Sequence, residues 1–300
     1  MIAFLVHGAV LAIQQLPLKW VARLGRAGGA IAWYLDARHR RVMLENMRLA
    51  FPEWDPAKVR ETARENMKRI GENYACAVKT AVMDPEELLQ ICDVVGTEKF
   101  PEFGKEDGPK NCVVAIGHFG NFELYAQIVR NIEEMQGATT YRGLKQPGLN
   151  AIMQMLRQKS GCLFFERRSE AEQLRSALNE GGILLGLLSD QHAGNSGVWS
   201  PFLGRNCSTT PAAAILALRY EAPLFTAICY RTSLGRWTIE LGDEIQTQEN
   251  GKPRSVEALV GDINRALEAA VIRDPANWFW VHNRWKPRKL KPNRSPSGAA

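Results

Sequence analysis

The sequence predicts an α/β protein in which a central mixed sheet is flanked by helices and preceded by an N-terminal helical region. From Asn111 onwards, short β-rich apolar runs alternate with amphipathic segments of helix length, which is typical of α/β folds. Before that point the patterns are helical. The 300 residues, 45% of them hydrophobic and 23% charged, can form a large core, which excludes disordered and fibrous classes.

Helical signals dominate the first part of the chain and recur between the strands. Asp55 as N-cap and Pro56 at the first helical position open a long helix that runs towards Val82. Ser169 and Glu172 have the spacing of a capping box. The expected helices are 1–16, 40–50, 56–82, 122–134, 147–159, 169–179, 211–220, 255–272 and 275–283.

The strands are expected where short apolar runs rich in β-branched and aromatic residues are bounded by polar residues or glycine. Their spacing, with a helical segment between most of them, favours a sheet covered by helices. The expected strands are 112–116, 138–141, 162–165, 183–188, 224–230 and 236–241.

The first sixteen residues form an apolar stretch that is too short to cross a membrane. Pro17 ends the stretch before the roughly 20 residues that a spanning helix needs. A secretory signal is a poor match, because the basic residues follow the apolar stretch instead of preceding it. We expect a helix that lies in or dips into a membrane interface, with an ordinary core helix as the alternative. The residues expected at its polar edge are Lys19, Trp20, Arg23 and Arg26.

The net charge of +6 is concentrated at the two ends. Residues 1–44 carry six basic residues and one acidic residue, residues 284–300 carry six basic residues, and the part between has a net charge of −5. Basic ends on an acidic body indicate contact with a polyanion, and each Lys or Arg near an anionic membrane contributes about 1 kcal/mol. Solvated tails are the alternative. The chain is therefore divided into a helical, membrane-associating region (1–90), an α/β domain (91–287) and a basic polar tail (288–300).

A histidine stands where α/β proteins place active sites. Gly117 and Gly120 flank His118 at the carboxyl end of the strand 112–116, which leaves the imidazole exposed. Glu123, in the first helical turn, can fold back and hydrogen-bond one ring nitrogen. The carboxylate would fix the tautomer, so that the other nitrogen takes a proton from a hydroxyl as a general base. A structural role for this pair is the alternative.

No motif for a protein nucleophile accompanies this base. The chain lacks G-x-S-x-G, H-E-x-x-H, the P-loop and a G-x-G-x-x-G that follows a strand. A substrate hydroxyl or water is therefore expected to attack. The six cysteines include no C-x-x-C pair, and the other four histidines are scattered, so no metal site is expected and a reducing compartment is favoured.

Several blocks of sequence, taken in order, resemble one family. Residues 117–123, Gly-His-Phe-Gly-Asn-Phe-Glu, resemble the H-x4-(D/E) signature of the glycerolipid acyltransferases in its Glu form. Nearly the whole chain resembles the bacterial lipid A secondary acyltransferases, which transfer lauroyl and myristoyl groups, and their relatives that acylate phosphatidylinositol mannosides. The other blocks are 45–52, 141–142 with 146–147, Arg157 ahead of Gly161, 165–168, 189–191, 201–204 and 277–286.

The resemblance implies transfer of a fatty acyl chain from acyl carrier protein or coenzyme A to a hydroxyl of a membrane glycolipid, without a cofactor. It implies that His118 is the base and Glu123 its partner. Arg142 and Arg157 match positions that hold polar substrate groups, and a guanidinium suits phosphate. Asp190 would orient a loop or an arginine. The substrate-binding residues implied are Asn121, Arg142, Arg157, Arg167, Asp190 and Gly204.

The resemblance also implies the cytoplasmic face of the bacterial inner membrane as the location. Many family members carry a spanning anchor at the N-terminus, so the short apolar stretch here favours monotopic or N-terminal attachment to an anionic membrane surface. Three tryptophans beside the basic tail suit an interfacial belt, with a core position as the alternative. They are Trp278, Trp280 and Trp285.

Other functions remain open alongside this one. A lipid A precursor is the first choice of acceptor, and a phosphatidylinositol mannoside or another lysolipid is the alternative. A thioester hydrolase would use water at the same base. A nonenzymatic membrane-binding protein would need only the charged ends, and a nucleic-acid partner is not expected.

Overall fold

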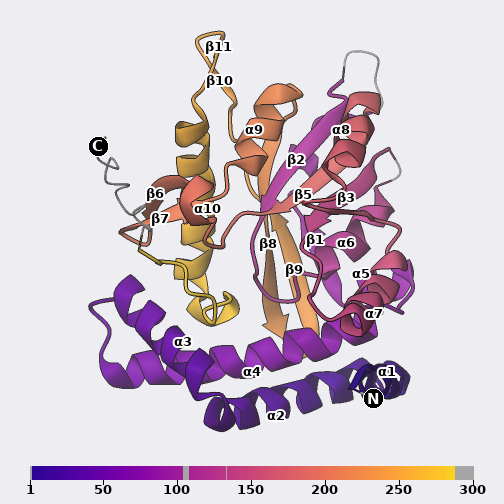
Figure 1. Ribbon diagram of the computed structural model, residues 1–300, viewed down its shortest axis with the longest axis vertical. Coiled ribbons are helices and arrows are strands. Elements are labelled where there is room, and N and C mark those ends of the chain that lie inside the picture. Colours follow the sequence, from indigo (N-terminus) through magenta and orange to yellow (C-terminus); the bar gives the residue numbers. More distant parts are fainter. Residues whose placement is uncertain (1, 104–107, 133, 288–300) are drawn as a thin grey trace, which may run out of the picture.

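A seven-stranded sheet stands on a layer of N-terminal helices, with further helices against its faces (Figure 1). The protein is seen in a computed structural model that describes residues 2–103, 108–132 and 134–287. The predicted α/β fold, with a mixed central sheet and flanking helices, is confirmed. The basic tail predicted at 288–300 lies outside the described residues.

Five helices precede the sheet. The long helix begins where the sequence predicts, because the Asp55 side chain accepts a hydrogen bond from the Lys58 amide at 2.8 Å and Pro56 occupies the first position. Residues 18–35, where no separate helix is predicted, form one directly after Pro17. The helices are α1 (Ile2–Gln15), α2 (Leu18–Leu35), α3 (Ala37–Ala50), α4 (Pro56–Thr80) and α5 (Pro85–Leu89).

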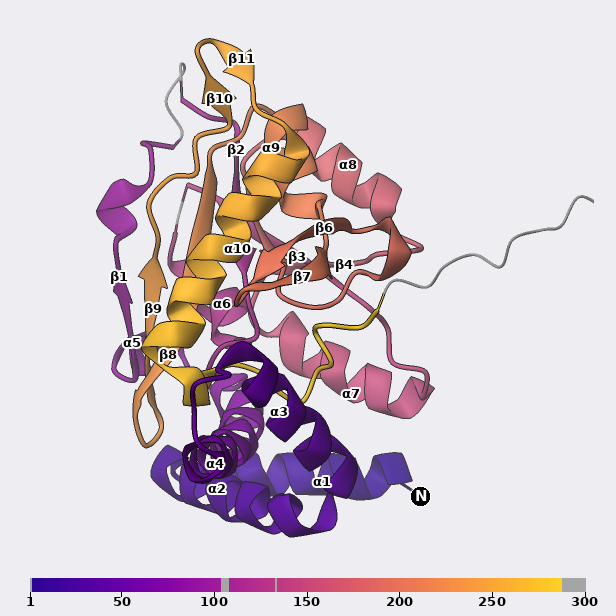
Figure 2. The same ribbon diagram turned by 90° about the vertical axis from the view of Figure 1, so that its left-hand side faces the viewer.

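Glycines allow α2 and α4 to pack with their backbones in contact. A Cβ at Gly29 of α2 would lie 2.3 Å from the carbonyl oxygen of Met67, and one at Gly71 of α4 would lie 2.2 Å from that of Gly25. No side chain can occupy such a space, so the close crossing depends on the missing Cβ atoms. The crossing joins α2 firmly to α4, which lies between α2 and the sheet in both ribbon views (Figures 1 and 2).

The strand order across the sheet is β1-β9-β8-β2-β5-β3-β4. The five strands from β8 to β4 are parallel, whereas β9 is antiparallel to β8, and β1 is parallel to β9. The sequence predicts six of these strands but not β1. The bounds are β1 (Cys92–Val95), β2 (Asn111–Ile116), β3 (Gln136–Tyr141), β4 (Leu163–Glu166), β5 (Ile183–Leu188), β8 (Leu224–Ser233) and β9 (Arg236–Leu241).

The two faces of the sheet pack against different helices, because successive side chains of a strand point to opposite faces. On β2, Val113 and Ala115 belong to the core with α8 (Ala171–Glu180), α9 (Ala212–Arg219) and α10 (Val256–Arg273). Val114 and Ile116 face the other way, towards the short helix α6 (Leu124–Ile128). The remaining elements are α7 (Pro147–Gln158), the hairpin β6 (Val198–Phe202) and β7 (Arg205–Thr209), and the small hairpin β10 (Gln248–Glu249) and β11 (Lys252–Pro253).

Three local predictions are wrong. The helix expected at 122–134 is only α6 followed by a 3-10 turn at Val129–Asn131, because the β-branched residues there are weak helix formers. The helix expected at 275–283 is a 3-10 turn, Pro275–Asn277, followed by irregular chain whose carbonyls bond to other elements. The capping box at α8 does not form, since Ser169 bonds Glu166 instead.

Two neighbouring glycines of α2 test the close crossing. We expect Gly29→Ala to lower the free energy of unfolding by about 1–3 kcal/mol or more, because its methyl group would overlap the Met67 carbonyl. Gly28→Ala is the matched control: its Cβ meets nothing within 4 Å, so the better helix former should stabilise the protein by about 0.5–1 kcal/mol. Urea unfolding of both variants measures the difference, and equal effects would contradict the packing.

Candidate active site

Two strand ends bring His118 and Asp190 together. Because β2 and β5 are adjacent and parallel, the residues that follow them meet at one edge of the sheet. His118 Nδ1 lies 2.7 Å from Asp190 Oδ1, and the His118 amide donates to Asp190 Oδ2 at 2.8 Å. A third donor comes from the C-terminal segment, where the indole Nε1 of Trp278 donates to the same Oδ2 at 2.8 Å.

The Asp190 carboxylate is ionised although it is only 1% exposed. Burial by itself would raise its pKa, but the charge and hydrogen bonds of His118, with the bond from Trp278, outweigh burial and lower the pKa to about 2. An ionised carboxylate only accepts hydrogen bonds, so His118 Nδ1 carries the proton. Nε2 is therefore the ring nitrogen that can accept a proton.

The ring of His118 is held among aromatic side chains. Phe279 stacks on it with centroids 5.7 Å apart and planes 27° apart, and Phe122 meets it edge-on at 4.9 Å. The side-chain nitrogen of Gln191 lies 3.3 Å from Nε2. The imidazole is thus fixed on both sides, with its basic nitrogen beside a carboxamide.

Glu123 pairs with Arg157 and not with His118. Arg157 donates to both carboxylate oxygens, from Nη2 at 2.7 Å and from Nε at 3.2 Å. The sequence-based hypothesis that Glu123 folds back onto the imidazole is therefore wrong for this geometry. Two tertiary contacts explain the difference. Asp190 already bonds Nδ1 of His118, and Arg157 of α7 forms a bidentate ion pair with Glu123.

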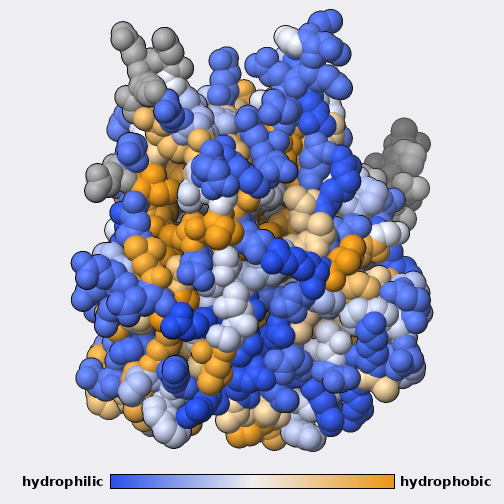
Figure 3. Space-filling view, turned by 180° about the vertical axis from the view of Figure 1, so that it is seen from behind, coloured by the Kyte–Doolittle hydropathy of each residue, from blue (hydrophilic) through white to orange (hydrophobic). Residues whose placement is uncertain are grey.

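An apolar cavity of about 280 Å³ begins at this ion pair. Glu123, Arg157 and Phe122 line it together with apolar side chains of the sheet face that α6 covers. Figure 3 shows apolar side chains gathered in a hollow on the back of the molecule, above the N-terminal helices. The apolar lining includes Val94, Phe100, Val114, Ile116, Ile128, Leu184, Leu188, Ile239 and Leu241.

A second, smaller cavity of about 20 Å³ lies beside His118. Asn66 and Asn121, each 1% exposed, line it, and their Oδ1 atoms have no hydrogen-bond partner among the described residues. The volume suffices for one water molecule. Asn121, chosen from the sequence as a substrate-binding residue, thus shares a cavity with His118.

The other site residues chosen from the sequence lie farther from the base. Arg142 follows β3 and Arg167 follows β4, so both lie at the strand ends, but they are exposed and their guanidinium groups bond no described residue. Gly204, with φ of +70°, is in the turn between β6 and β7 and lines neither cavity at His118. Glycine is needed there for the turn.

The C-terminal segment supports the site from inside the protein, which corrects two predictions. Trp278 and Trp280, expected in an interfacial belt, are 1% and 0% exposed. Arg284, counted with the basic end, is fully buried, and its Nη1 donates to the carbonyl oxygens of Gln191 and Ser208. The buried position is the one given above as the alternative to an interfacial belt, and the apolar pattern Trp-Phe-Trp-Val at 278–281 is consistent with it.

The N-terminal helices present apolar side chains to the outside. Trp20, Leu24 and Ile31 recur at helical spacing on α2 and are 55%, 57% and 59% exposed. Phe4 of α1 is 81% exposed. Arg26, expected at the polar edge, instead turns inward to Glu65 and Glu72. Among the described helices, none combines the length and hydropathy needed to cross a bilayer.

The fold and this site define the class of protein. The profile of the bacterial lipid A biosynthesis acyltransferase family matches residues 1–287, so the chain belongs to that family and is an acyltransferase of lipid A biosynthesis. It therefore has an acyl donor and a lipid acceptor as substrates.

Two relatives from Escherichia coli (strain K12) match over most of their length. The chain is similar to the lipid A biosynthesis lauroyltransferase, with 22% identity over 285 residues that cover 94% of this chain and 90% of the relative. The lipid A biosynthesis palmitoleoyltransferase is 21% identical over 281 residues, which cover 92% of this chain and 88% of the relative.

Proposed function

We propose that this protein transfers a fatty acyl chain from a thioester of acyl carrier protein or coenzyme A to a hydroxyl of a lipid A precursor, with His118 as general base. The observation that carries the proposal is the pair formed by His118 and the buried Asp190, close to an apolar cavity of about 280 Å³. The residue pair supplies a base that can activate a hydroxyl, and the apolar cavity suits a hydrocarbon chain. The relatives' names give lauroyl and palmitoleoyl groups for those proteins.

Proton transfer follows from the tautomer of His118. Nε2 takes the proton of the acceptor hydroxyl as its oxygen attacks the thioester carbonyl, and the Asp190 carboxylate stabilises the imidazolium that forms. The tetrahedral intermediate then collapses: the carbon–sulfur bond breaks, the ester remains on the acceptor, and the imidazolium returns its proton to the thiolate. We assign the Gln191 carboxamide, whose nitrogen lies 3.3 Å from Nε2, as a neutral donor to the oxyanion.

The ion pair of Glu123 and Arg157 takes a different role in this scheme. Both residues line the apolar cavity, and Glu123 also lines the small cavity beside His118. We place the pair at the junction where the acyl chain meets the reacting carbonyl. Glu123 then acts by holding Arg157, whose guanidinium lines the cavity and is assigned to bind polar substrate groups there.

Three variants test the assignment of the base. We expect His118→Ala and Asp190→Asn each to lower kcat by about 10²- to 10⁴-fold, because proton transfer loses its base or the partner that fixes its tautomer. Glu123→Gln should raise the KM for the donor more than it lowers kcat, since it loosens Arg157 without touching His118. Purified protein, acyl thioester and lipid A precursor, with products resolved by mass spectrometry, provide the measurement.

The products also discriminate between the open alternatives. Ester formed only when the precursor is present supports acyl transfer. Free fatty acid formed equally fast without any acceptor would instead make the protein a thioester hydrolase. Full activity of His118→Ala would exclude the proposed base altogether.

The apolar cavity predicts a preference for acyl chain length. Gly186 lies in the middle of β5 and lines the cavity, and a Cβ there would be 3.5 Å from Ile116, an ordinary contact. Gly186→Leu should therefore fold but fill part of the cavity, so that the ratio of long-chain to short-chain transfer falls about tenfold or more. Paired assays of two chain lengths on one preparation measure it, and an unchanged ratio would place the chain elsewhere.

We further propose that α1 and α2 rest on the cytoplasmic face of the inner membrane, where the acceptor lipid resides. The exposed apolar side chains of α2 suit the acyl boundary of a bilayer. Exposed basic residues on α2 and on the adjoining helix α3 suit anionic headgroups. These are Lys19, Arg23, Arg38 and Arg41.

Two side chains with the same exposure test this surface. Leu24 on α2 and Ile272 on α10 are both 57% exposed. We expect Leu24→Ser to weaken binding to vesicles of phosphatidylethanolamine and phosphatidylglycerol by about tenfold, because a buried leucine contributes about 1.5–3 kcal/mol. Ile272→Ser should leave binding unchanged. Sedimentation with vesicles decides, and equal effects of both changes would contradict an oriented contact.

A further inference from the structure

Two asparagines of the N-terminal helices hold four carbonyls of the C-terminal segment. Asn46 of α3 donates from its amide nitrogen to the carbonyl oxygens of Trp280 and His282, both at 2.8 Å. Asn66 of α4 donates in the same way to those of Ala276 and Trp278, at 2.8 and 2.6 Å. The four carbonyls belong to every second residue from 276 to 282. From this arrangement we infer that Asn46 and Asn66 are positioning residues for the His118–Asp190 pair.

The held segment is the one that completes the base. Trp278 donates to Asp190, and Phe279 stacks on His118. The same segment pairs with the backbone next to the base, since Phe119 and Trp278 form a β-bridge and the Gly120 amide donates to the Asn277 carbonyl at 3.1 Å. A shift of this segment would therefore move both the donor to Asp190 and the ring that fixes His118.

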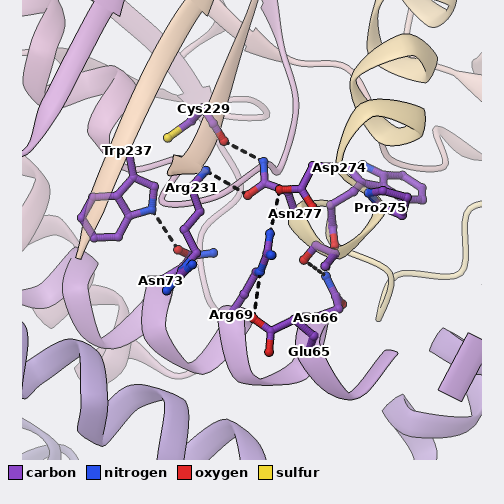
Figure 4. A network of polar contacts seen from close by, with 12 residues as sticks. Glu65, Asn66, Arg69, Asn73, Cys229, Arg231, Trp237, Asp274, Pro275 and Asn277 are labelled. Atoms are coloured by element: carbon purple, nitrogen blue, oxygen red, sulfur yellow. Dashed lines mark hydrogen bonds and ion pairs between the residues drawn. The ribbon is translucent and has the colours of Figure 1, made fainter. Parts of the chain in front are cut away.

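The two asparagines suit this role because both side chains are buried and each amide nitrogen bonds two carbonyls of this segment. Asn46 is 2% exposed and Asn66 1% exposed, so both side chains are shielded from bulk solvent. Without them the carbonyls of an irregular, buried segment would lack partners, which is costly. Figure 4 shows Asn66 and Arg69 projecting from α4 towards this segment, whereas Asn73 accepts from the indole of Trp237 on β9. In the same segment, Asn277 bonds strand β8.

This inference gives the N-terminal helices a second role besides the proposed membrane contact. It rests on the proposed function of His118 and Asp190. If it holds, Asn66→Ala and Asn46→Ala lower kcat by about 10- to 100-fold while the KM for the acyl donor changes less than about threefold. Misplacement of a catalytic group by about 1 Å has an effect of this size. Two variants are used so that one remains if the other does not fold.

Asn111 offers a matched control. It is 2% exposed, and its side chain likewise bonds two backbone groups, the Leu178 carbonyl and the Ile183 amide, but at the opposite end of β2 from His118. We expect Asn111→Ala to reduce stability by a similar amount and to leave kcat unchanged. If Asn111→Ala lowered kcat as much as Asn66→Ala does, the asparagines would be structural only, and the inference would fail.

A double-mutant cycle and a spectroscopic readout complete the test. Because Asn66 would act through Trp278, the losses in kcat of Asn66→Ala and Trp278→Phe should not add in the double variant, whereas full additivity would overturn the inference. In NMR spectra of the full chain, the indole N–H signal assigned by Trp278→Phe should shift in Asn66→Ala but stay in Asn111→Ala. The NMR shift can be measured without any enzymatic activity. An unchanged signal in Asn66→Ala would therefore contradict the inference even if the proposed acyl transfer is correct.

Discussion

The buried carboxylate of Asp190 is the interaction on which the site depends. Its two oxygens accept hydrogen bonds from the His118 amide, the His118 ring and the Trp278 indole, which come from two separate parts of the chain. A charge buried to this degree is tolerated only when it is paired and hydrogen-bonded. The same bonds that keep Asp190 ionised therefore set the tautomer of His118 and fix the position of the C-terminal segment.

The N-terminal helices contribute both to the candidate active site and to the proposed membrane-contacting surface. On one side, α4 packs against α2 through glycines, and α2 exposes an apolar stripe. On the other side, α4 and α3 hold the segment 276–282 through Asn66 and Asn46. One helix thus lies between the proposed membrane contact and the proposed base, so the two functions share a single structural element.

The two cavities share Glu123 and Phe122 in their linings. The larger, apolar cavity lies on the sheet face that packs against the short helix α6. The ion pair between Glu123 and Arg157 marks the boundary between this cavity and the base. This placement gives Glu123 a proposed role through Arg157 and not through contact with the histidine.

Local sequence patterns are enough to predict the α/β class, most strand and helix positions, and His118 at a strand end, because periodicity, caps and breakers act between neighbouring residues. The strand Ile183–Leu188 and the start of the helix at Pro56 agree with the prediction to the residue. The partner of His118 depends on tertiary contacts, since Asp190 is 72 residues away and reaches it through the pairing of β2 with β5. Tertiary contacts also bury Trp278, Trp280 and Arg284. Composition cannot distinguish a core tryptophan or a buried arginine from exposed ones, because burial depends on which distant segments cover the side chain.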